Sequence, residues 1–136
     1  MKIEYANSSD FDFLTNFDKH ISEDELKKAL SDKRIIILKN ANEYCAWLRF
    51  GLFWDNTPFL NMLMVLENHR NKGYACALLQ FWETAMKNQG YNLLLASSQS
   101  DENAQNLYRK LGYSDAGVLL LKTQVSELIF SKELKS

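Results

Sequence analysis

The feature that most constrains the fold is a change of hydrophobic period near the middle of the chain. The apolar run FLNMLMVL (59–66) is followed by the polar stretch ENHRNK and then by Gly73. Beyond that glycine, apolar residues recur with the spacing of a helix that buries one face. These residues are Ala75, Leu78, Leu79, Trp82 and Met86. A strand, a short polar loop and a helix are therefore predicted, and Gly90 stands where a C′ glycine would end the helix.

The N-terminal third predicts a short strand followed by two helices. Residues 2–6 are the candidate strand, and SSDFDFLTNFDKH offers Ser8 and Ser9 as N-caps for the first helix. In ISEDELKKALSDK, the pair Ser22 and Glu25 has the spacing of a capping box, which predicts the second helix.

Three strands are predicted between the second helix and the loop, and one strand directly after the central helix. RIIILKN (34–40) and YCAWLRFGLFW (44–54) read as strands, with Gly51 as a candidate bulge. DNTP (55–58) turns the chain back into the apolar run as an antiparallel neighbour. YNLLLASS (91–98) is nearly continuously apolar, the pattern of a strand buried on both faces.

The C-terminal part predicts a short helix and a hairpin. DENAQNLYRKLGY has Asp101 as a candidate N-cap and Gly112 as the stop, and GVLLLKT and SELIFSKEL follow as two strands. The complete order is β-α-α-β-β-β-α-β-α-β-β. This order predicts the α/β class, with a mixed central sheet flanked by helices.

Composition sets the class of protein. A chain of 136 residues with 46% apolar and 24% charged residues is expected to form a single domain over 1–136. A net charge of −1 disfavours nucleic acid as the main partner. No apolar run is long enough to span a membrane and no signal peptide is evident, so we expect a cytoplasmic protein. Cys45 and Cys76 lack the spacing of a metal site or disulfide framework, so no metal is expected.

The loop before the central helix has the residues of an anion site. Unpaired N–H groups and the dipole of a helix start favour phosphate, and Gly73 would let the backbone approach it. Arg70 and Lys72 add positive charge, and Ala75 keeps the next turn small. The pattern is R-x-x-G-x-A, whereas GxxxxGK[ST] and GxGxxG are absent. From this motif alone, a solvated loop at a helix start is an equally good interpretation.

A second motif makes the pattern more specific. Tyr108 follows Gly73 by 35 residues, within A-x-x-L-Y-x-K-L-G-Y. Together with the R-x-x-G-x-A loop, this segment resembles the GNAT superfamily of acyl-CoA-dependent N-acetyltransferases, best over residues 59–113. The resemblance implies a single-domain GNAT-like fold and acetyl-CoA as co-substrate.

The resemblance also implies which residues contact acetyl-CoA. The pantetheine arm would bond to the strand before the loop, at Leu63, Met64 and Val65. The diphosphate would rest on the loop, at Arg70, Asn71, Lys72, Gly73, Tyr74 and Ala75. Asn71 replaces a frequent glycine of the family. Asn103, five residues before the tyrosine, either contacts the cofactor or only occupies the first helical turn, and Asp101 stands where many members have asparagine.

The resemblance makes Tyr108 the candidate catalytic residue. A tyrosine with an ordinary pKa of about 10 can protonate a leaving thiolate, whose ordinary pKa is about 8.5. In the alternative, its ring packs under the loop and its hydroxyl only bonds the sulfur. Neither cysteine neighbours a histidine that could activate it, which disfavours a covalent route.

No residue is assigned as the general base. Asn61 and Glu67 lie on or just beyond the strand before the loop, and Asp55, Gln99 and Glu102 could line the acceptor side. Each of the last three is also explained as a turn residue or a cap. A chain of water molecules could replace a dedicated base.

Other conspicuous residues allow two interpretations. Trp54 and Phe59 could bind an apolar or cationic acceptor. In the alternative, the aromatic residues of this segment alternate between the core and positions that cover helices, as Trp47, Phe50 and Phe53 would also do. His69 could touch the diphosphate or lie solvated in the loop.

Three hypotheses about function follow. The first is an N-acetyltransferase that acetylates a primary amine of a small molecule or peptide by direct attack. The second is a non-catalytic acyl-CoA-binding sensor, and the third, weaker one is a nucleotide-binding α/β domain. The acceptor is not specified, and a homodimer through the C-terminal strands is possible.

Overall fold

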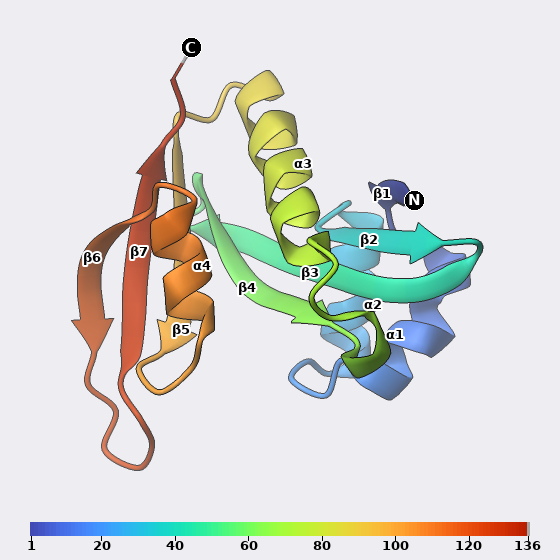
Figure 1. Ribbon diagram of the computed structural model, residues 1–136, viewed down its shortest axis with the longest axis horizontal. Coiled ribbons are helices and arrows are strands. Elements are labelled where there is room, and N and C mark those ends of the chain that lie inside the picture. Colours follow the sequence, from blue (N-terminus) through green and yellow to red (C-terminus); the bar gives the residue numbers. More distant parts are fainter. Residues whose placement is uncertain (136) are drawn as a thin grey trace. The chain divides into compact units, whose positions relative to one another are not determined.

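The computed structural model describes residues 1–135 and has an α/β fold (Figure 1). Its elements are β1 (Lys2–Tyr5), α1 (Phe11–Phe17), α2 (Glu23–Ser31), β2 (Ile35–Asn40), β3 (Glu43–Phe53), β4 (Thr57–Val65), α3 (Tyr74–Asn88), β5 (Leu93–Gln99), α4 (Ala104–Lys110), β6 (Ser114–Leu119) and β7 (Glu127–Glu133). Two short 3-10 turns precede α1 and α3, at Ser8–Asp10 and Glu67–His69. The predicted fold class and element order are confirmed.

The seven strands found in the described residues form one mixed sheet with the order β1-β2-β3-β4-β5-β7-β6. β4 and β5 pair in parallel, through Phe59–Leu95 and Leu60–Ala96. The pairs β1–β2, β2–β3, β5–β7 and β6–β7 are antiparallel. The parallel pair is connected by α3, as a strand–helix–strand crossover requires.

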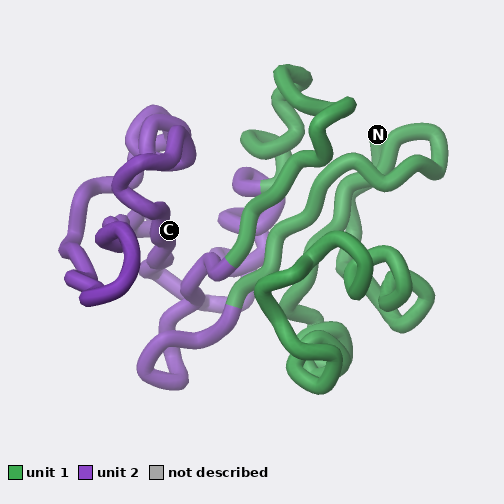
Figure 2. Tube along the Cα trace, turned by 90° about the horizontal axis from the view of Figure 1, so that it is seen from below, with its two compact units in different colours: residues 1–50, 62–78 green, residues 51–61, 79–136 purple. Residues whose placement is uncertain are grey.

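The chain divides into two compact units, which Figure 2 shows in different colours. Unit 1 comprises residues 1–50 and 62–78, and unit 2 comprises residues 51–61 and 79–135. β3, β4 and α3 each contribute residues to both units. That residues 1–136 behave as a single domain stays a prediction.

The core of unit 1 is built by α1, α2, β2 and β3. Its fully buried members are Leu14, Leu26, Ile35, Ile37 and Trp47, together with the nearly buried Ala6 and Leu30. All four residues of β2 from Ile35 to Leu38 are buried, so both faces of this strand are covered. The run IIIL, rich in β-branched isoleucine, therefore forms a strand as predicted, and the structure adds that both of its faces are covered.

The start of the first helix differs from the prediction. Neither Ser8 nor Ser9 is the cap, because the side chain of Asn7 accepts a hydrogen bond from the Ser9 N–H at 2.9 Å. A 3-10 turn follows, and α1 begins only at Phe11. Ser22 does cap α2, and its hydroxyl accepts from the Glu25 N–H at 3.2 Å.

Three predictions in unit 2 are also corrected. β5 is buried at alternate positions only, Leu94, Ala96 and Ser98, so it is not covered equally on both faces. The N-cap of α4 is Asn103 rather than Asp101. β6 begins at residue 114 rather than 117 and is exposed along its length. Gly90 and Gly112 have positive φ angles where the helices end, as predicted.

A buried ion pair ties the end of α1 to β3 within unit 1. The carboxylate of Asp18 accepts from Arg49 Nε at 2.9 Å and from a terminal nitrogen of Arg49 at 3.3 Å. Trp47 Nε1 also donates to it, at 3.4 Å. Asp18 is 3% exposed and Arg49 is 8% exposed. Because water cannot replace either partner, removal of one leaves an uncompensated buried charge.

We therefore expect Asp18→Asn to lower the free energy of unfolding by about 3–5 kcal/mol. Urea denaturation followed by circular dichroism measures this loss. Glu25→Gln is the control, because Glu25 pairs with Lys28 in solvent and such pairs contribute little. Equal midpoints for wild type and Asp18→Asn would show that the buried pair does not stabilise unit 1.

Candidate active site

The loop between β4 and α3, in unit 1, has a backbone shaped by two residues with positive φ. Asn71 has a φ of +63° and Gly73 a φ of +79°. Asparagine is the residue other than glycine that best tolerates this region, which explains why it can stand at a position where a glycine is frequent. A Cβ at Gly73 would meet no atom within 4 Å, so the space beside its backbone is open. The loop therefore offers a free approach to the first N–H groups of α3.

The positive charges of this loop are not neutralised by unit 1. Arg70 Nε donates to the carbonyl of Val65 at 3.2 Å, which fixes the guanidinium against the end of β4. Neither Arg70 nor Lys72 forms an ion pair among the described residues of unit 1, and both are exposed. Two cations therefore lie in one exposed loop before the positive end of a helix of 15 residues.

The remaining residues predicted to contact the cofactor lie on the elements that flank the loop. Tyr74 is buried at the start of α3, and its hydroxyl accepts from Asn40 Nδ2 at 3.4 Å. Ala75 is half-buried in the same turn. Met64 packs against the core of unit 1, and Leu63 and Val65 alternate with it along β4. Tyr74 and Ala75 thus continue the loop into the first turn of α3, while Leu63, Met64 and Val65 precede it on β4.

Tyr108 lies on α4, in unit 2, and is 3% exposed. Its ring contacts Tyr113 and Phe130, with ring centroids 5.6 Å and 5.5 Å away. Burial, followed by the negative charges of Glu102 and Glu127, raises the pKa of the Tyr108 hydroxyl well above its ordinary value. Within the described part of unit 2 this hydroxyl has no hydrogen-bond partner. It therefore stays protonated at neutral pH and keeps a free donor.

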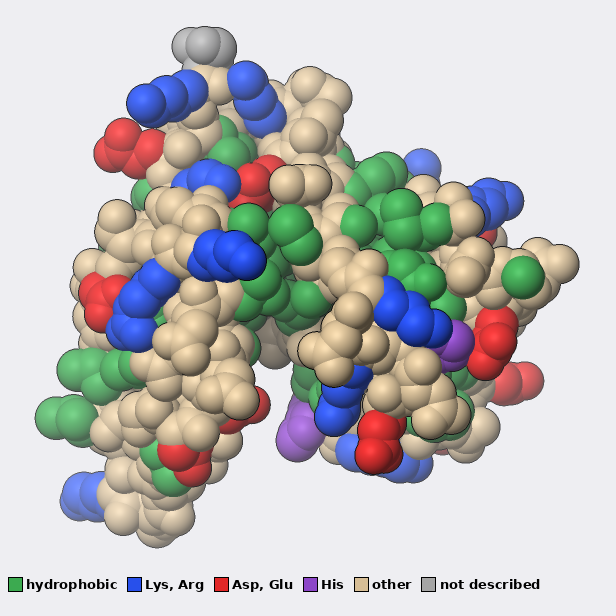
Figure 3. All heavy atoms as spheres, viewed as in Figure 1, with side chains coloured by type: hydrophobic (Ala, Val, Ile, Leu, Met, Phe, Trp, Pro, Cys, Tyr) green, Lys and Arg blue, Asp and Glu red, His purple; other side chains and the backbone are tan. Residues whose placement is uncertain are grey.

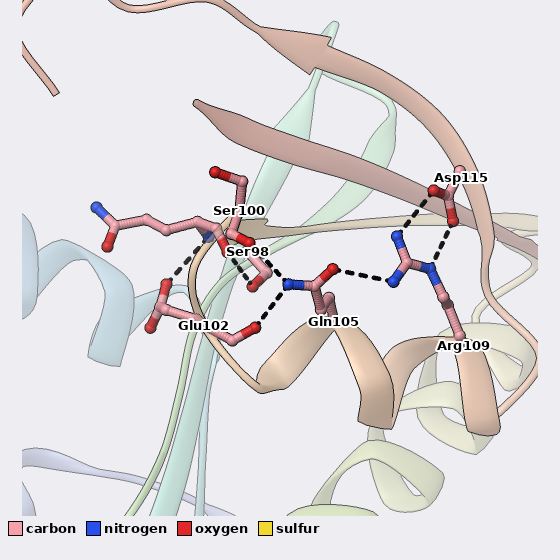
Figure 4. A network of polar contacts seen from close by, with 7 residues as sticks. Ser98, Ser100, Glu102, Gln105, Arg109 and Asp115 are labelled. Atoms are coloured by element: carbon pink, nitrogen blue, oxygen red, sulfur yellow. Dashed lines mark hydrogen bonds and ion pairs between the residues drawn. The ribbon is translucent and has the colours of Figure 1, made fainter. Parts of the chain in front are cut away.

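A network of polar contacts fixes the helix that carries Tyr108 (Figure 4). Gln105 Nε2 donates to the carbonyls of Ser100 and Glu102, each at 2.9 Å, and this ties the start of α4 to the preceding loop. At the other end, Arg109 donates twice to the carboxylate of Asp115 on β6, at 2.9 Å each. Arg109 also donates to Gln105 at 2.9 Å. The two ends of α4 are thus linked along the face next to Tyr108.

The predicted companions of Tyr108 have different surroundings. Asn103 caps α4 by position, but its side chain makes no capping hydrogen bond, so its amide remains available. Asp101 is exposed in the preceding turn. Glu102 uses its carboxylate to accept from the Gln99 N–H at 3.0 Å, which explains it as a loop residue. Glu127 was not predicted as a neighbour of Tyr108 from the sequence. The effect of its negative charge on the Tyr108 pKa is what identifies it as one.

The remaining residues singled out in the sequence differ in their burial and contacts. Asp55 is exposed in the turn after β3, at a φ of +62°, and Glu67 is exposed in the 3-10 turn. His69 Nε2 lies 3.1 Å from a carboxylate oxygen of Glu43, so the histidine is held in unit 1 rather than free in solvent. Among the aromatic residues, Trp47 and Phe50 are core, whereas Phe53 and Trp54 are exposed. The core interpretation is therefore confirmed for Trp47 and Phe50, whereas acceptor binding by Trp54 and Phe59 stays a prediction.

The cysteines and the acidic side chains of residues 1–135 are not clustered. Cys45 is buried and Cys76 is half-buried, and both are free thiols. Residues 1–135 contain no group of three or more His, Cys, Asp or Glu side chains arranged to hold a metal ion. None of the helices in that range is long and apolar enough to cross a membrane. On the face drawn in Figure 3, basic and acidic side chains lie interspersed over each unit.

Solved structures of known proteins resemble this fold over nearly its whole length. A GNAT-family acetyltransferase from Bacillus cereus is 22% identical, with a TM-score of 0.80 and coverage of 99% of this chain and 98% of that one. The ribosomal-protein-S18-alanine N-acetyltransferase from Escherichia coli is 17% identical, with a TM-score of 0.83 and coverage of 99% and 94%. A Salmonella typhimurium protein solved with its cofactor acetyl-CoA is 15% identical, with a TM-score of 0.82 and coverage of 100% and 95%.

These likenesses show the fold, because each identity is below 25%. No curated protein sequence matches the chain. The family itself is shown by the model of the acetyltransferase (GNAT) family, which matches residues 4–113 and so includes both the β4–α3 loop and the Tyr108 helix. The chain therefore belongs to the GNAT family of acetyltransferases and is an acyltransferase.

Proposed function

We propose that this protein is an N-acetyltransferase that transfers the acetyl group of acetyl-CoA to a primary amine of a small molecule or a peptide. The observation that carries the proposal is the β4–α3 loop, with an open backbone at Gly73 and two cations without an acidic partner in unit 1. An anionic cofactor is the ligand that such a loop favours. Among the similar structures, one has acetyl-CoA as its cofactor and another acts on the alanine of a ribosomal protein.

The proposed contacts follow the chain from β4 into α3. The pantetheine arm bonds to the backbone of Leu63, Met64 and Val65, beyond the two-pair ladder that β4 forms with β5 in unit 2. The diphosphate lies on residues 70–75, where Arg70 donates two hydrogen bonds and Lys72 acts as a point charge. Asn103, whose amide has no capping bond, is a further cofactor contact.

The reaction proceeds by direct attack. The neutral amine nitrogen forms a bond to the thioester carbon, the carbon–sulfur bond breaks, and the electron pair leaves with the CoA sulfur. The nitrogen loses one proton and the sulfur gains one, so the products are an N-acetylated amine and CoA. Tyr108 donates to the sulfur as its negative charge develops. The amine proton leaves through a chain of water molecules, which takes the place of a dedicated base.

We also propose a cellular location and an oligomeric state. The free thiols Cys45 and Cys76 suit the reducing cytoplasm, which we propose as its location. The exposed strand β6 is the end of the sheet, and its edge supports the proposal of a homodimer.

Acetyl-CoA is expected to raise the melting temperature, and Arg70→Ala is expected to weaken the effect. At about 100 times Kd a ligand adds about 2.7 kcal/mol, which moves a domain of this size by several degrees. Loss of the guanidinium removes charge-assisted hydrogen bonds and should weaken binding roughly ten- to a hundredfold. Thermal unfolding with acetyl-CoA, CoA, ATP or buffer measures both effects.

Lys28→Ala is the matched control, since Lys28 is an exposed cation of unit 1 on α2, outside the loop. Acetyl-CoA should shift this variant as it shifts wild type. The absence of any shift with acetyl-CoA and CoA at millimolar concentration would exclude the loop as a cofactor site. A shift with ATP alone would favour the nucleotide-binding hypothesis instead.

Tyr108→Phe is expected to lower kcat at least about tenfold and to leave acetyl-CoA affinity nearly unchanged, because the lost hydrogen bond strengthens only in the transition state. Since burial and two carboxylates raise the pKa of this hydroxyl, its deprotonation should cause no loss of wild-type activity below pH 10. CoA release followed with a thiol reagent across pH gives both results.

Tyr113→Phe is the control for the loss of a buried phenol in unit 2. The Tyr113 hydroxyl donates to Glu83 at 2.8 Å, so its removal should reduce stability but not kcat. Equal turnover by Tyr108→Phe and wild type would remove Tyr108 from the reaction. Cofactor binding without acetylation of any amine would favour the sensor hypothesis.

A further inference from the structure

Unit 2 contains an apolar pocket on one face of its strands. The pocket has a volume of about 380 Å³, within the range of small-molecule sites. Its apolar side chains come from β3, β4, β5, β6 and β7 and are Leu52, Phe53, Phe59, Leu95, Leu119 and Ile129. The residues that alternate with these, Leu60, Ala96 and Phe130, are fully buried on the opposite face. The pocket therefore lies on the face of the sheet that the core of unit 2 does not use.

One polar side chain lines this pocket. Asn61 follows Phe59 by two residues on β4, and its Nδ2 lies 3.2 Å from the place that a Cβ of Gly51 would occupy. The glycine thus leaves room for the amide. Within the described residues of unit 2 the Asn61 side chain forms no hydrogen bond, so it can offer one to a ligand.

A carboxylate stands beside the pocket on the same face. Glu127 pairs directly with Leu119 across β6 and β7 and precedes Ile129 by two residues. Paired residues share a face, with Cβ atoms about 5 Å apart, so Glu127 extends on the side of the pocket. Glu127 is half-buried and has no ion pair or hydrogen bond for its carboxylate among residues 1–135. A half-buried carboxylate without a partner favours a cation.

We propose that this pocket binds the acceptor, and that the acceptor is a primary monoamine with a compact aromatic or branched aliphatic body. This inference rests on the proposed function, which supplies the amine. The apolar body fills the pocket, Asn61 gives one hydrogen bond, and Glu127 pairs with the ammonium group before it loses its proton. A polyamine or an aminoglycoside would place additional charges against the apolar side chains and lose their hydration.

The first test compares amines at saturating acetyl-CoA. Along ethylamine, propylamine, butylamine and pentylamine, kcat/KM should rise about fourfold for each buried methylene. Phenethylamine should exceed ethanolamine, spermidine and kanamycin by at least about tenfold. A flat series, or a preference for spermidine or kanamycin, would overturn the proposal.

Variants of two neighbouring leucines locate the effect. Leu119 lines the pocket and is 52% exposed, whereas Leu120 is 81% exposed and outside it. Leu119→Ser should lower kcat/KM for phenethylamine about tenfold, since it removes buried apolar area. Leu120→Ser should not change it. Because both side chains are exposed, either variant should fold, and equal effects would contradict the assignment.

A second pair of variants tests the carboxylate. Glu127→Gln should raise KM for phenethylamine about tenfold and leave the acetyl-CoA affinity unchanged, because a charged hydrogen bond is lost. Glu133→Gln, an exposed residue at the other end of β7, is the control and should behave as wild type. An unchanged KM in Glu127→Gln would remove Glu127 from acceptor binding.

The same samples separate the two proposals. If acetyl-CoA produces no thermal shift, the proposed function fails. If acetyl-CoA shifts the melting temperature but phenethylamine is neither acetylated nor bound in calorimetry with CoA present, the proposed function stands and the pocket assignment fails.

Discussion

The passage of the chain from β4 into α3 depends on two backbone positions in the left-handed region. At Asn71 and Gly73 an L-residue with an ordinary side chain costs about 1–2 kcal/mol, so the sequence places there the two residue types that tolerate this conformation. The turn that they allow exposes the start of a helix of 15 residues. It also sets Arg70 against the carbonyl of Val65, which holds one cation at the end of the strand. Backbone strain, charge and helix dipole therefore act at the same few residues.

Much of this could be predicted because the signals are local. The change of period after residue 66, the glycine before α3 and the tyrosine segment each lie within one element, and together they predicted the family that the family match confirms. Errors arose where neighbouring residues compete for one role. Asn7 lies beside Ser8 and Ser9, and Asn103 lies beside Asp101, so the sequence offers several caps and only the backbone decides which is used.

Features that join distant parts of a unit could not be predicted in this way. Asp18 and Arg49 are 31 residues apart, and nothing local marks either as buried. The pocket in unit 2 is lined from five strands, and Glu127 is placed beside it by strand register alone. A shift of one residue would turn Glu127 to the other face. The proposed acceptor site therefore depends on strand pairing, whereas the proposed cofactor loop depends on local sequence.

The surroundings of Tyr108 limit how a proton can reach the CoA sulfur. A hydroxyl whose pKa is raised by burial and by two carboxylates is a weaker acid than a thiol of ordinary pKa, so complete proton transfer from Tyr108 to the CoA thiolate is unfavourable. The same hydroxyl remains a neutral donor without a partner in unit 2, which suits a hydrogen bond that shortens as charge develops on sulfur. The network that fixes both ends of α4 holds the ring in place without using this hydroxyl. We therefore propose that Tyr108 stabilises the leaving thiolate through this hydrogen bond, and that the thiolate then takes its proton from water.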